Sequence, residues 1–195
     1  MSYNLGFTAG ALLYNEAKIY VENISDFTDF LDGTENVNQL VIPTNSESSK
    51  KRIKSELDKR LKNLQIHYLH AFQSLSVVDQ KIILFLAICK TYTIIAEFAL
   101  EVVYQKWKTF DYDLQTYDFQ YFLSQKLSVE EIDKISENTR YKLSQVAIKI
   151  FKEVGIYSKE KIIAVEPSYD LMRIISENNE QWFLNCLMLN SQILK

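Results

Sequence analysis

Glycine and proline are scarce in this chain, which contains only four glycines and two prolines in 195 residues. Sandwiches and barrels need many such residues for their turns, so their scarcity favours helices. Hydrophobic residues make up 47% of the chain, enough for a substantial core. The sequence therefore predicts a mainly α protein, a compact helical bundle forming a single domain over residues 1–195. At most a small β element is expected near residues 161–166, where "KIIAVEP" alone resembles a strand.

Apolar residues recur at helical spacing through most of the chain. Capping signals then divide it: Ser25 before a short helix that stops at Gly33, Thr44 with Glu47 as a capping box, and Ser76 with Asp79. The predicted helices cover residues 9–24, 26–33, 45–64, 66–74, 77–109 with a break near 90–92, 116–126, 129–136, 139–155, 168–177 and 180–190.

The two cysteines, Cys89 and Cys186, lie far apart within apolar stretches. They resemble buried thiols rather than a disulfide framework, which favours the cytoplasm. No export signal is evident at the N-terminus. Residues 82–104 are apolar but carry Lys90, Glu97 and Glu101, each costly near the centre of a membrane helix, so a core segment is expected there and no membrane association.

Positive charge is concentrated in two segments of a chain whose net charge is −3. Residues 46–62 hold seven Lys or Arg and three acids, and residues 134–161 also hold seven and three. The net charge of the chain thus says little about its partners, whereas the positions of these two basic islands are informative.

The first basic island is predicted to be amphipathic. On a helical wheel Ile53, Leu57, Leu61 and Leu64 gather on one side, and Lys51, Arg52, Ser55, Lys59 and Lys62 on the other. Glu56 and Asp58 are displaced to the flanks, which predicts a patch of bases rather than alternating ion pairs. Such a face suits phosphates, although an ordinary solvated face carries equal weight. The candidate nucleic-acid-binding residues here are Lys50, Lys51, Arg52, Lys54, Ser55, Lys59 and Lys62.

In the second basic island, a short helix, a tight junction at residues 137–138, a longer helix and a strand resemble a winged helix-turn-helix. This suggests a winged-helix-like subdomain over residues 128–167. Its candidate DNA-contacting residues are Arg140, Lys142, Lys149 and Lys152, with Lys159 and Lys161 flanking the strand. A plain helical hairpin followed by a strand is the alternative, and the commoner pattern.

No catalytic motif is visible. Neither G-x-G-x-x-G nor G-x-x-x-x-G-K occurs, and no nucleophile–base arrangement surrounds any Ser or Cys. His67 and His70 could share a helix face, but zinc needs further ligands. We therefore expect no enzyme, no metal site and no cofactor.

Residues 109–122, "TFDYDLQTYDFQYF", combine six aromatic residues with three acids. Bases can stack on aromatic rings, but the neighbouring negative charge repels phosphate. Core packing is the favoured interpretation of this aromatic-acidic segment, and a surface for a protein partner is the second.

Several stretches in order resemble the BrxA family of BREX bacteriophage-exclusion systems. They are "GALLYNEAKIYV", "SESSKKRIKSELDKRLKNL", "KTYTIIAEFALEVV", "NTRYKLSQVAIKIFKEVGI" and "EPSYDLM". The resemblance runs from about residue 5 to residue 189. It implies a compact helical fold like that of the antitermination factor NusB, DNA binding without catalysis, and other BREX proteins as partners. The family's DNA contacts would fall on Lys51, Arg52, Lys59 and Lys62.

The function expected from these observations is binding to the DNA backbone, duplex DNA above all, with weak sequence preference. Two alternatives stay open. The chain could be a protein–protein adaptor that docks a partner through its aromatic-acidic segment, or an RNA-binding factor by analogy with the NusB fold.

Overall fold

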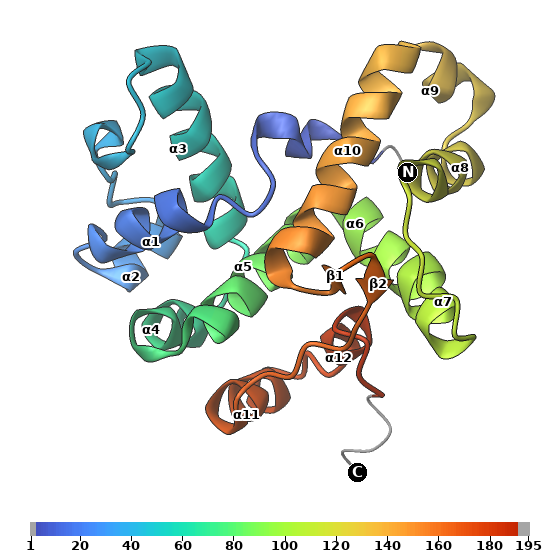
Figure 1. The fold of residues 1–195 in the computed structure, drawn as a ribbon. Coiled ribbons are helices and arrows are strands. Elements are labelled where there is room, and N and C mark those ends of the chain that lie inside the picture. The colour runs from blue at the N-terminus through green and yellow to red at the C-terminus, as the bar shows by residue number, and fades with distance from the viewer. Residues whose placement is uncertain (1–2, 191–195) are drawn as a thin grey trace. The chain divides into compact units, whose positions relative to one another are not determined.

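The computed structural model describes residues 3–190 and is mainly helical, as the sequence predicts (Figure 1). It divides into two compact units. The first, called here the α3 unit, is Leu12–Thr91 with Pro167–Asn178; the second, the α10 unit, is Met1–Ala11 with Tyr92–Glu166 and Asn179–Lys195. That the two act as the single domain 1–195 stays a prediction, whose residues 1–2 and 191–195 lie outside the described part.

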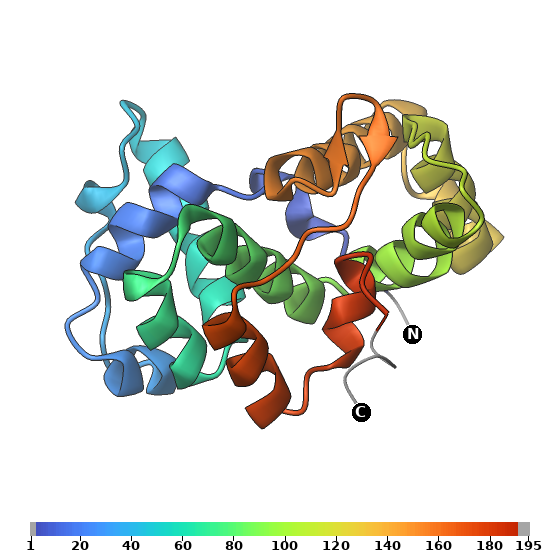
Figure 2. The same cartoon turned by 60° about the horizontal axis from the view of Figure 1, so that its bottom comes forward.

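Helices account for all the regular structure described in the α3 unit. They are α1 (Tyr14–Glu22), α2 (Phe27–Asp32), the 3-10 turn η2 (Gln39–Val41), α3 (Glu47–Leu61), α4 (Ile66–Ser74), α5 (Val77–Thr91) and α11 (Tyr169–Glu177). Although α11 is distant in sequence, it packs against α4 (Figures 1 and 2). The backbone N–H of Ser168, its N-cap, donates to Asp79 Oδ1 at 2.9 Å, which ties the start of α11 to α5.

The core of the α3 unit forms where α3 packs against α5 and α1, while α4 packs against α5, α1 and α2. Leu57 and Leu61 supply the buried side of α3. Tyr20 of α1 and Phe30 of α2 are also buried, with their rings in edge-to-face contact at 6.3 Å between centroids. Burial of such side chains gives each of these short helices a stability that it would lack alone.

The α10 unit combines helices with a hairpin. Its elements are the 3-10 turn η1 (Gly6–Ala9), α6 (Thr93–Phe98), the π-helical turn η3 (Ala99–Val103), α7 (Tyr104–Lys108), α8 (Thr116–Lys126), α9 (Val129–Asp133), α10 (Glu137–Val154), β1 (Tyr157–Ser158), β2 (Lys161–Ile162) and α12 (Trp182–Cys186).

An aromatic cluster fills the centre of the α10 unit. The ring of Phe98 lies 4.9 Å from that of Phe119, 5.3 Å from that of Phe122 and 5.7 Å from that of Phe151. Phe7 reaches Phe119 from η1, with ring centroids 6.0 Å apart. Edge-to-face and tilted ring contacts of this kind hold α6, α8 and α10 together.

The β element is a hairpin at the predicted place, but shorter than predicted. β1 and β2 are antiparallel, with Tyr157 opposite Ile162 and Ser158 opposite Lys161. The two turn residues, Lys159 and Glu160, have positive φ angles of 49° and 60°. A two-residue turn of type I′ has positive φ at both residues and usually takes Asn-Gly there. This chain has Lys-Glu instead, so no turn signal in the sequence marks the first strand.

Several helix boundaries differ from the predicted ones. The first helix begins only at Tyr14, after η1 and a left-handed Leu13, instead of after Thr8. The N-cap of α2 is Asp26 rather than Ser25, because the Asp26 carboxylate accepts from two backbone N–H groups. Gly33 does end α2, in the left-handed conformation with φ 81° that favours glycine.

Within residues 3–190, no single helix is long and apolar enough to cross a bilayer. Val77–Thr91 and Thr93–Lys108 meet that test of length and composition only when taken together, across a break at Tyr92.

Candidate nucleic-acid interface

Helix α3 begins with a side-chain cap. Ser46 Oγ accepts a hydrogen bond from the backbone N–H of Ser49 at 3.4 Å. The predicted capping box of Thr44 with Glu47 is therefore wrong, because Glu47 is already the first helical residue. Leu57 and Leu61 are buried as predicted, and they fix which side of the helix faces outward.

The opposite side of α3, called here the outer face of α3, consists of five exposed residues: Lys51, Arg52, Ser55, Lys59 and Lys62. At about 100° per residue they fall within an arc of about 100°. The predicted gathering of these residues on one exposed face is confirmed. Their contact with nucleic acid stays a prediction.

Lys50 and Lys54 lie away from the outer face of α3 and are largely covered. Lys50 Nζ is 3.0 Å from Glu47 Oε1, and Lys54 Nζ is 2.6 Å from Asp58 Oδ2. The prediction of a patch without alternating ion pairs is wrong here, because residues three or four apart on a helix lie side by side. These two lysines already have carboxylate partners.

A buried ion pair stabilises the same helix. The Arg60 Nε lies 2.6 Å from Glu56 Oε1, and both side chains are almost completely buried. The exposed Lys59 Nζ reaches the other oxygen of Glu56 at 3.0 Å. Glu56 thus neutralises an arginine that belongs, by sequence, to the first basic island.

Helix α10 carries the second basic island, and its N-cap is Ser136, which accepts from the Thr139 backbone N–H at 3.2 Å. The helix starts at Glu137, so the junction after α9 lies at residues 134–136 instead of 137–138. Lys142, Lys149 and Lys152 are all exposed. On the helix they fall within about 80° of one another and form a second face of bases.

Arg140 is separated from these lysines. It precedes Lys142 by two residues, which places it about 160° away around the helix. It is half-buried and borders a hollow of about 670 Å³ between α8, α9 and α10, together with Glu137 and Tyr141. The structure thus groups three of the four candidate residues of this island and leaves Arg140 on another side.

The hairpin follows α10 directly, as a winged-helix-like subdomain would require. Lys159 and Lys161 are exposed at its turn, and Lys152 Nζ lies 5.5 Å from the ring centroid of Tyr157 in β1. The assignment of residues 128–167 as a winged-helix-like subdomain stays a prediction. The first basic island belongs to the α3 unit and this one to the α10 unit.

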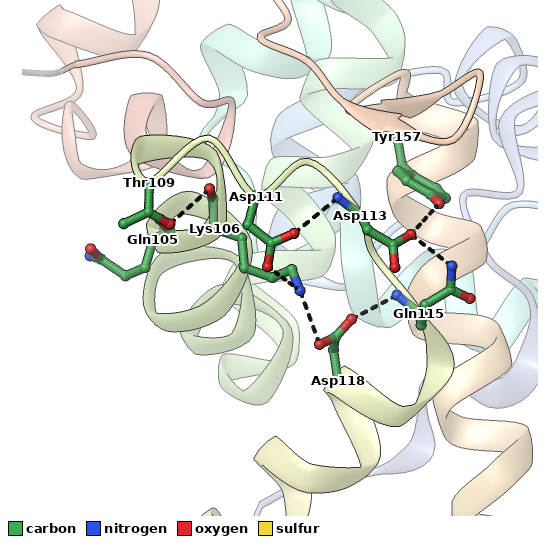
Figure 3. Close-up of polar contacts among 8 residues, drawn as sticks. All are labelled: Gln105, Lys106, Thr109, Asp111, Asp113, Gln115, Asp118 and Tyr157. Atoms are coloured by element: carbon green, nitrogen blue, oxygen red, sulfur yellow. Dashed lines mark hydrogen bonds and ion pairs between the residues drawn. The ribbon is translucent and has the colours of Figure 1, made fainter.

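The loop between α7 and α8, residues 109–115, takes part in a polar cluster (Figure 3). Lys106 Nζ lies 2.9 Å from Asp111 Oδ2 and 3.3 Å from Asp118 Oδ1. Burial alone would lower the pKa of Lys106, but the two aspartates outweigh it and raise that pKa. Asp113 Oδ1 accepts a hydrogen bond from Gln115 Nε2 at 2.7 Å. It also lies 3.4 Å from the Tyr157 hydroxyl, and this contact links the loop to β1. These contacts fix the start of α8.

The aromatic-acidic segment divides between core and surface. Phe119 and Phe122 are buried as expected for core packing, whereas Tyr117 and Tyr121 are 59% and 68% exposed. The segment forms the amphipathic helix α8, in which residues 117 and 121 share the outer side. The spacing of four between the two tyrosines was the signal in the sequence for this exposed pair.

The two histidines lie exposed on α4, where His70 contacts the ring of Phe27 at 4.9 Å between centroids. Among residues 3–190, no three side chains of the His, Cys, Asp or Glu type come together in a way that could hold a metal ion.

Comparison with known proteins gives a consistent result. The family model described as BrxA matches residues 1–179. The "BREX protein BrxA" of Bacillus cereus (strain H3081.97) is 29% identical over 136 residues, which are 69% of this chain and 68% of that protein. A crystal structure of an uncharacterized protein from Magnetospirillum magneticum has the same fold, with a TM-score of 0.72, 22% identity, and coverage of 96% of this chain and 99% of the other. Because the family model covers most of the chain, the protein belongs to the BrxA family.

Proposed function

We propose that this protein is a non-enzymatic, DNA-binding component of a BREX phage-defence system. Family membership supports its place in such a system. The observation that carries the DNA-binding proposal is the outer face of α3, where four bases and Ser55 lie exposed on one side of a helix.

A face of this kind suits the phosphate backbone for electrostatic reasons. Each Lys or Arg that neutralises a phosphate releases a condensed counterion, so affinity gains from every such pairing and weakens with salt. The acids of α3 pair with Lys50, Lys54, Lys59 and Arg60, and not with Lys51 or Lys62. The outer face therefore carries positive charge that the helix itself does not cancel.

The exposed lysines of α10 supply a second contact in this proposal. Lys142, Lys149 and Lys152 share a face, and Lys159 and Lys161 extend it at the hairpin. Lysine contacts to phosphate position a protein on DNA but read no sequence. Binding is therefore expected to vary little from one DNA sequence to another.

Catalysis is assigned to other components. The sequence has neither of the glycine-rich phosphate loops of nucleotide-hydrolysing enzymes. In this proposal the protein acts in the cytoplasm beside other BREX proteins and brings them to DNA.

The test is a titration of the purified protein against a fluorescent duplex of about two helical turns, the matching single strand and an RNA of the same sequence, each at several salt concentrations. We expect the duplex to bind best, with the logarithm of affinity falling linearly with the logarithm of salt. Tighter binding of the RNA would favour the antitermination-like alternative. Failure to bind any of the three at low salt would contradict the proposal.

A further inference from the structure

We propose that the outer side of α8, together with the π-helical turn η3, is a docking surface for a basic segment of a partner protein that carries a large apolar side chain. This surface is separate from the basic faces of α3 and α10 and goes beyond the proposed contact with DNA. For brevity it is called the α8 surface, defined by Glu101, Val102, Gln105, Lys106, Thr109, Tyr117, Asp118, Gln120 and Tyr121.

Two tyrosines form the apolar part of the α8 surface. Tyr117 and Tyr121, one turn apart on α8, border a hollow of about 800 Å³ whose far side is formed by Val102, Gln105 and Thr109. Within residues 3–190 neither tyrosine side chain makes a hydrogen bond or a ring contact. Exposed aromatic rings beside a hollow are typical of the centre of protein–protein interfaces.

The opposite wall of the hollow has an unusual backbone. Ala99–Val103 forms a π-helical turn between α6 and α7, and Glu101 and Val102 of that turn face the hollow. Turns of this kind are rare and are frequently found at functional sites. Here the turn belongs to the same surface as the exposed tyrosines.

Charge decides which partner this surface fits. Lys126 Nζ lies 2.7 Å from Glu97 Oε2 and 2.6 Å from Glu101 Oε1, so a single ammonium group faces two carboxylates. Lys106 has the same arrangement with Asp111 and Asp118 (Figure 3). Of these six groups Glu101, Asp118 and Lys106 belong to the α8 surface, and the other three are joined to them by these ion pairs. Four carboxylates in and beside the α8 surface thus share two ammonium groups. The surplus negative charge attracts a basic partner and repels phosphate.

The same surplus of negative charge argues against nucleic acid and against a second copy of this chain as the occupant of the α8 surface. Nucleic acid would bring phosphates against Glu101 and Asp111, whose side chains are about half exposed. A second copy joined through the same surface would place like charges together, because a two-fold contact pairs a patch with itself. A segment with Lys or Arg on either side of a Leu, Phe or Trp satisfies both parts of the surface, since its apolar side chain fills the hollow.

The test uses three labelled short peptides of equal length: one with several Lys or Arg around a central Leu-Trp, one with Ser-Gly in place of Leu-Trp, and one with Glu in place of every base. We expect the first to bind best by fluorescence anisotropy. Tyr117→Ala with Tyr121→Ala, and separately Glu101→Lys, should each weaken its binding by about tenfold or more. Tyr169→Ala is the control, because Tyr169 is 85% exposed on α11 of the other unit.

Other outcomes overturn the proposal. Equal binding of the first peptide to the wild type and to the double tyrosine variant would do so, provided that both unfold at the same temperature. Loss of duplex DNA binding in that variant would identify a nucleic-acid surface instead. A wild-type dimer that becomes a monomer on the tyrosine changes, measured by light scattering, would identify a second copy as the occupant.

Discussion

Lys54 and Asp58 form an ion pair one turn apart on α3, with 2.6 Å between Nζ and Oδ2. The other oxygen of the same carboxylate accepts a hydrogen bond from the Tyr20 hydroxyl of α1 at 2.5 Å. This part of the basic helix therefore holds α3 to α1. Part of the positive charge of α3 thus serves packing within the unit, whereas the bases of its outer face are exposed.

The contact between Tyr20 and Asp58 is expected to contribute to stability alone. Burial and the hydrogen bond to the Asp58 carboxylate raise the pKa of Tyr20 far above its ordinary value. Tyr20→Phe should lower the free energy of unfolding by about 1.5–3 kcal/mol, since it removes a partly buried hydrogen bond to a charged group. Urea denaturation measures this change. DNA affinity should stay the same, and a large loss of affinity would show that α1 takes part in binding.

The buried pair of Arg60 and Glu56 predicts a larger effect. Glu56→Ala takes away the carboxylate that lies 2.6 Å from the guanidinium, and breaking a buried pair in this way costs about 3–5 kcal/mol. Glu56→Gln is the matched control, because the amide oxygen can still accept a hydrogen bond, and it should cost less. Guanidinium chloride denaturation compares the two. Equal losses would mean that the charge of Glu56 contributes nothing.

Stability should fall in acid partly through the start of α2. Glu35 accepts from the backbone N–H groups of Ser25 and Asp26 at 2.7 and 2.8 Å, and these bonds lower its pKa below the ordinary 4.5. The unfolded chain therefore takes up this proton at a higher pH than the folded chain does. The contribution of Glu35 is complete above the ordinary pKa and is lost as the pH falls through its folded pKa.

The variant Glu35→Gln isolates this effect. The difference in unfolding free energy between wild type and variant should be largest near neutral pH and should shrink below about pH 4, in urea titrations at a series of pH values. A difference that stays constant from about pH 7 to about pH 3 would show that the ionised form of Glu35 has no special role. Because Glu35 is only partly covered by the protein, the effect is expected to be small.

Local signals in the sequence predicted much of the fold. The bounds of α4 and α8 agree with the predicted residues 66–74 and 116–126, since clear apolar spacing marks both helices. The break near residue 92 was also predicted, from the interrupted apolar run. The last helix was predicted over residues 180–190, but α12 covers only Trp182–Cys186, because the chain turns after it at Met188, whose φ is 62°.

The candidate site was predictable to the extent that it depends on helical geometry. The outer face of α3 followed from the spacing of its residues, as did the burial of Leu57. The ion pairs of Lys50 and Lys54 did not follow from the side of the helix on which each lysine lies. Such pairs depend instead on whether a residue three or four positions away carries the opposite charge. The separation of Arg140 from Lys142 also follows from their spacing of two on a helix, but the hollow that Arg140 borders depends on how α8 and α9 pack beside α10, which spacing does not give.

The most direct test of DNA binding through the outer face of α3 is the salt dependence of a fourfold variant, with Lys51, Arg52, Lys59 and Lys62 all changed to Ala. Lys50→Ala with Lys54→Ala is the control, which removes two bases from the same helix but away from that face. We expect the fourfold variant to fold, to lose affinity for all DNA sequences alike, and to have a slope of log affinity against log salt smaller by about one for each phosphate that it no longer neutralises. The control should keep nearly the wild-type slope. An unchanged affinity and slope in the fourfold variant, or an equal loss in the control, would contradict the proposed interface.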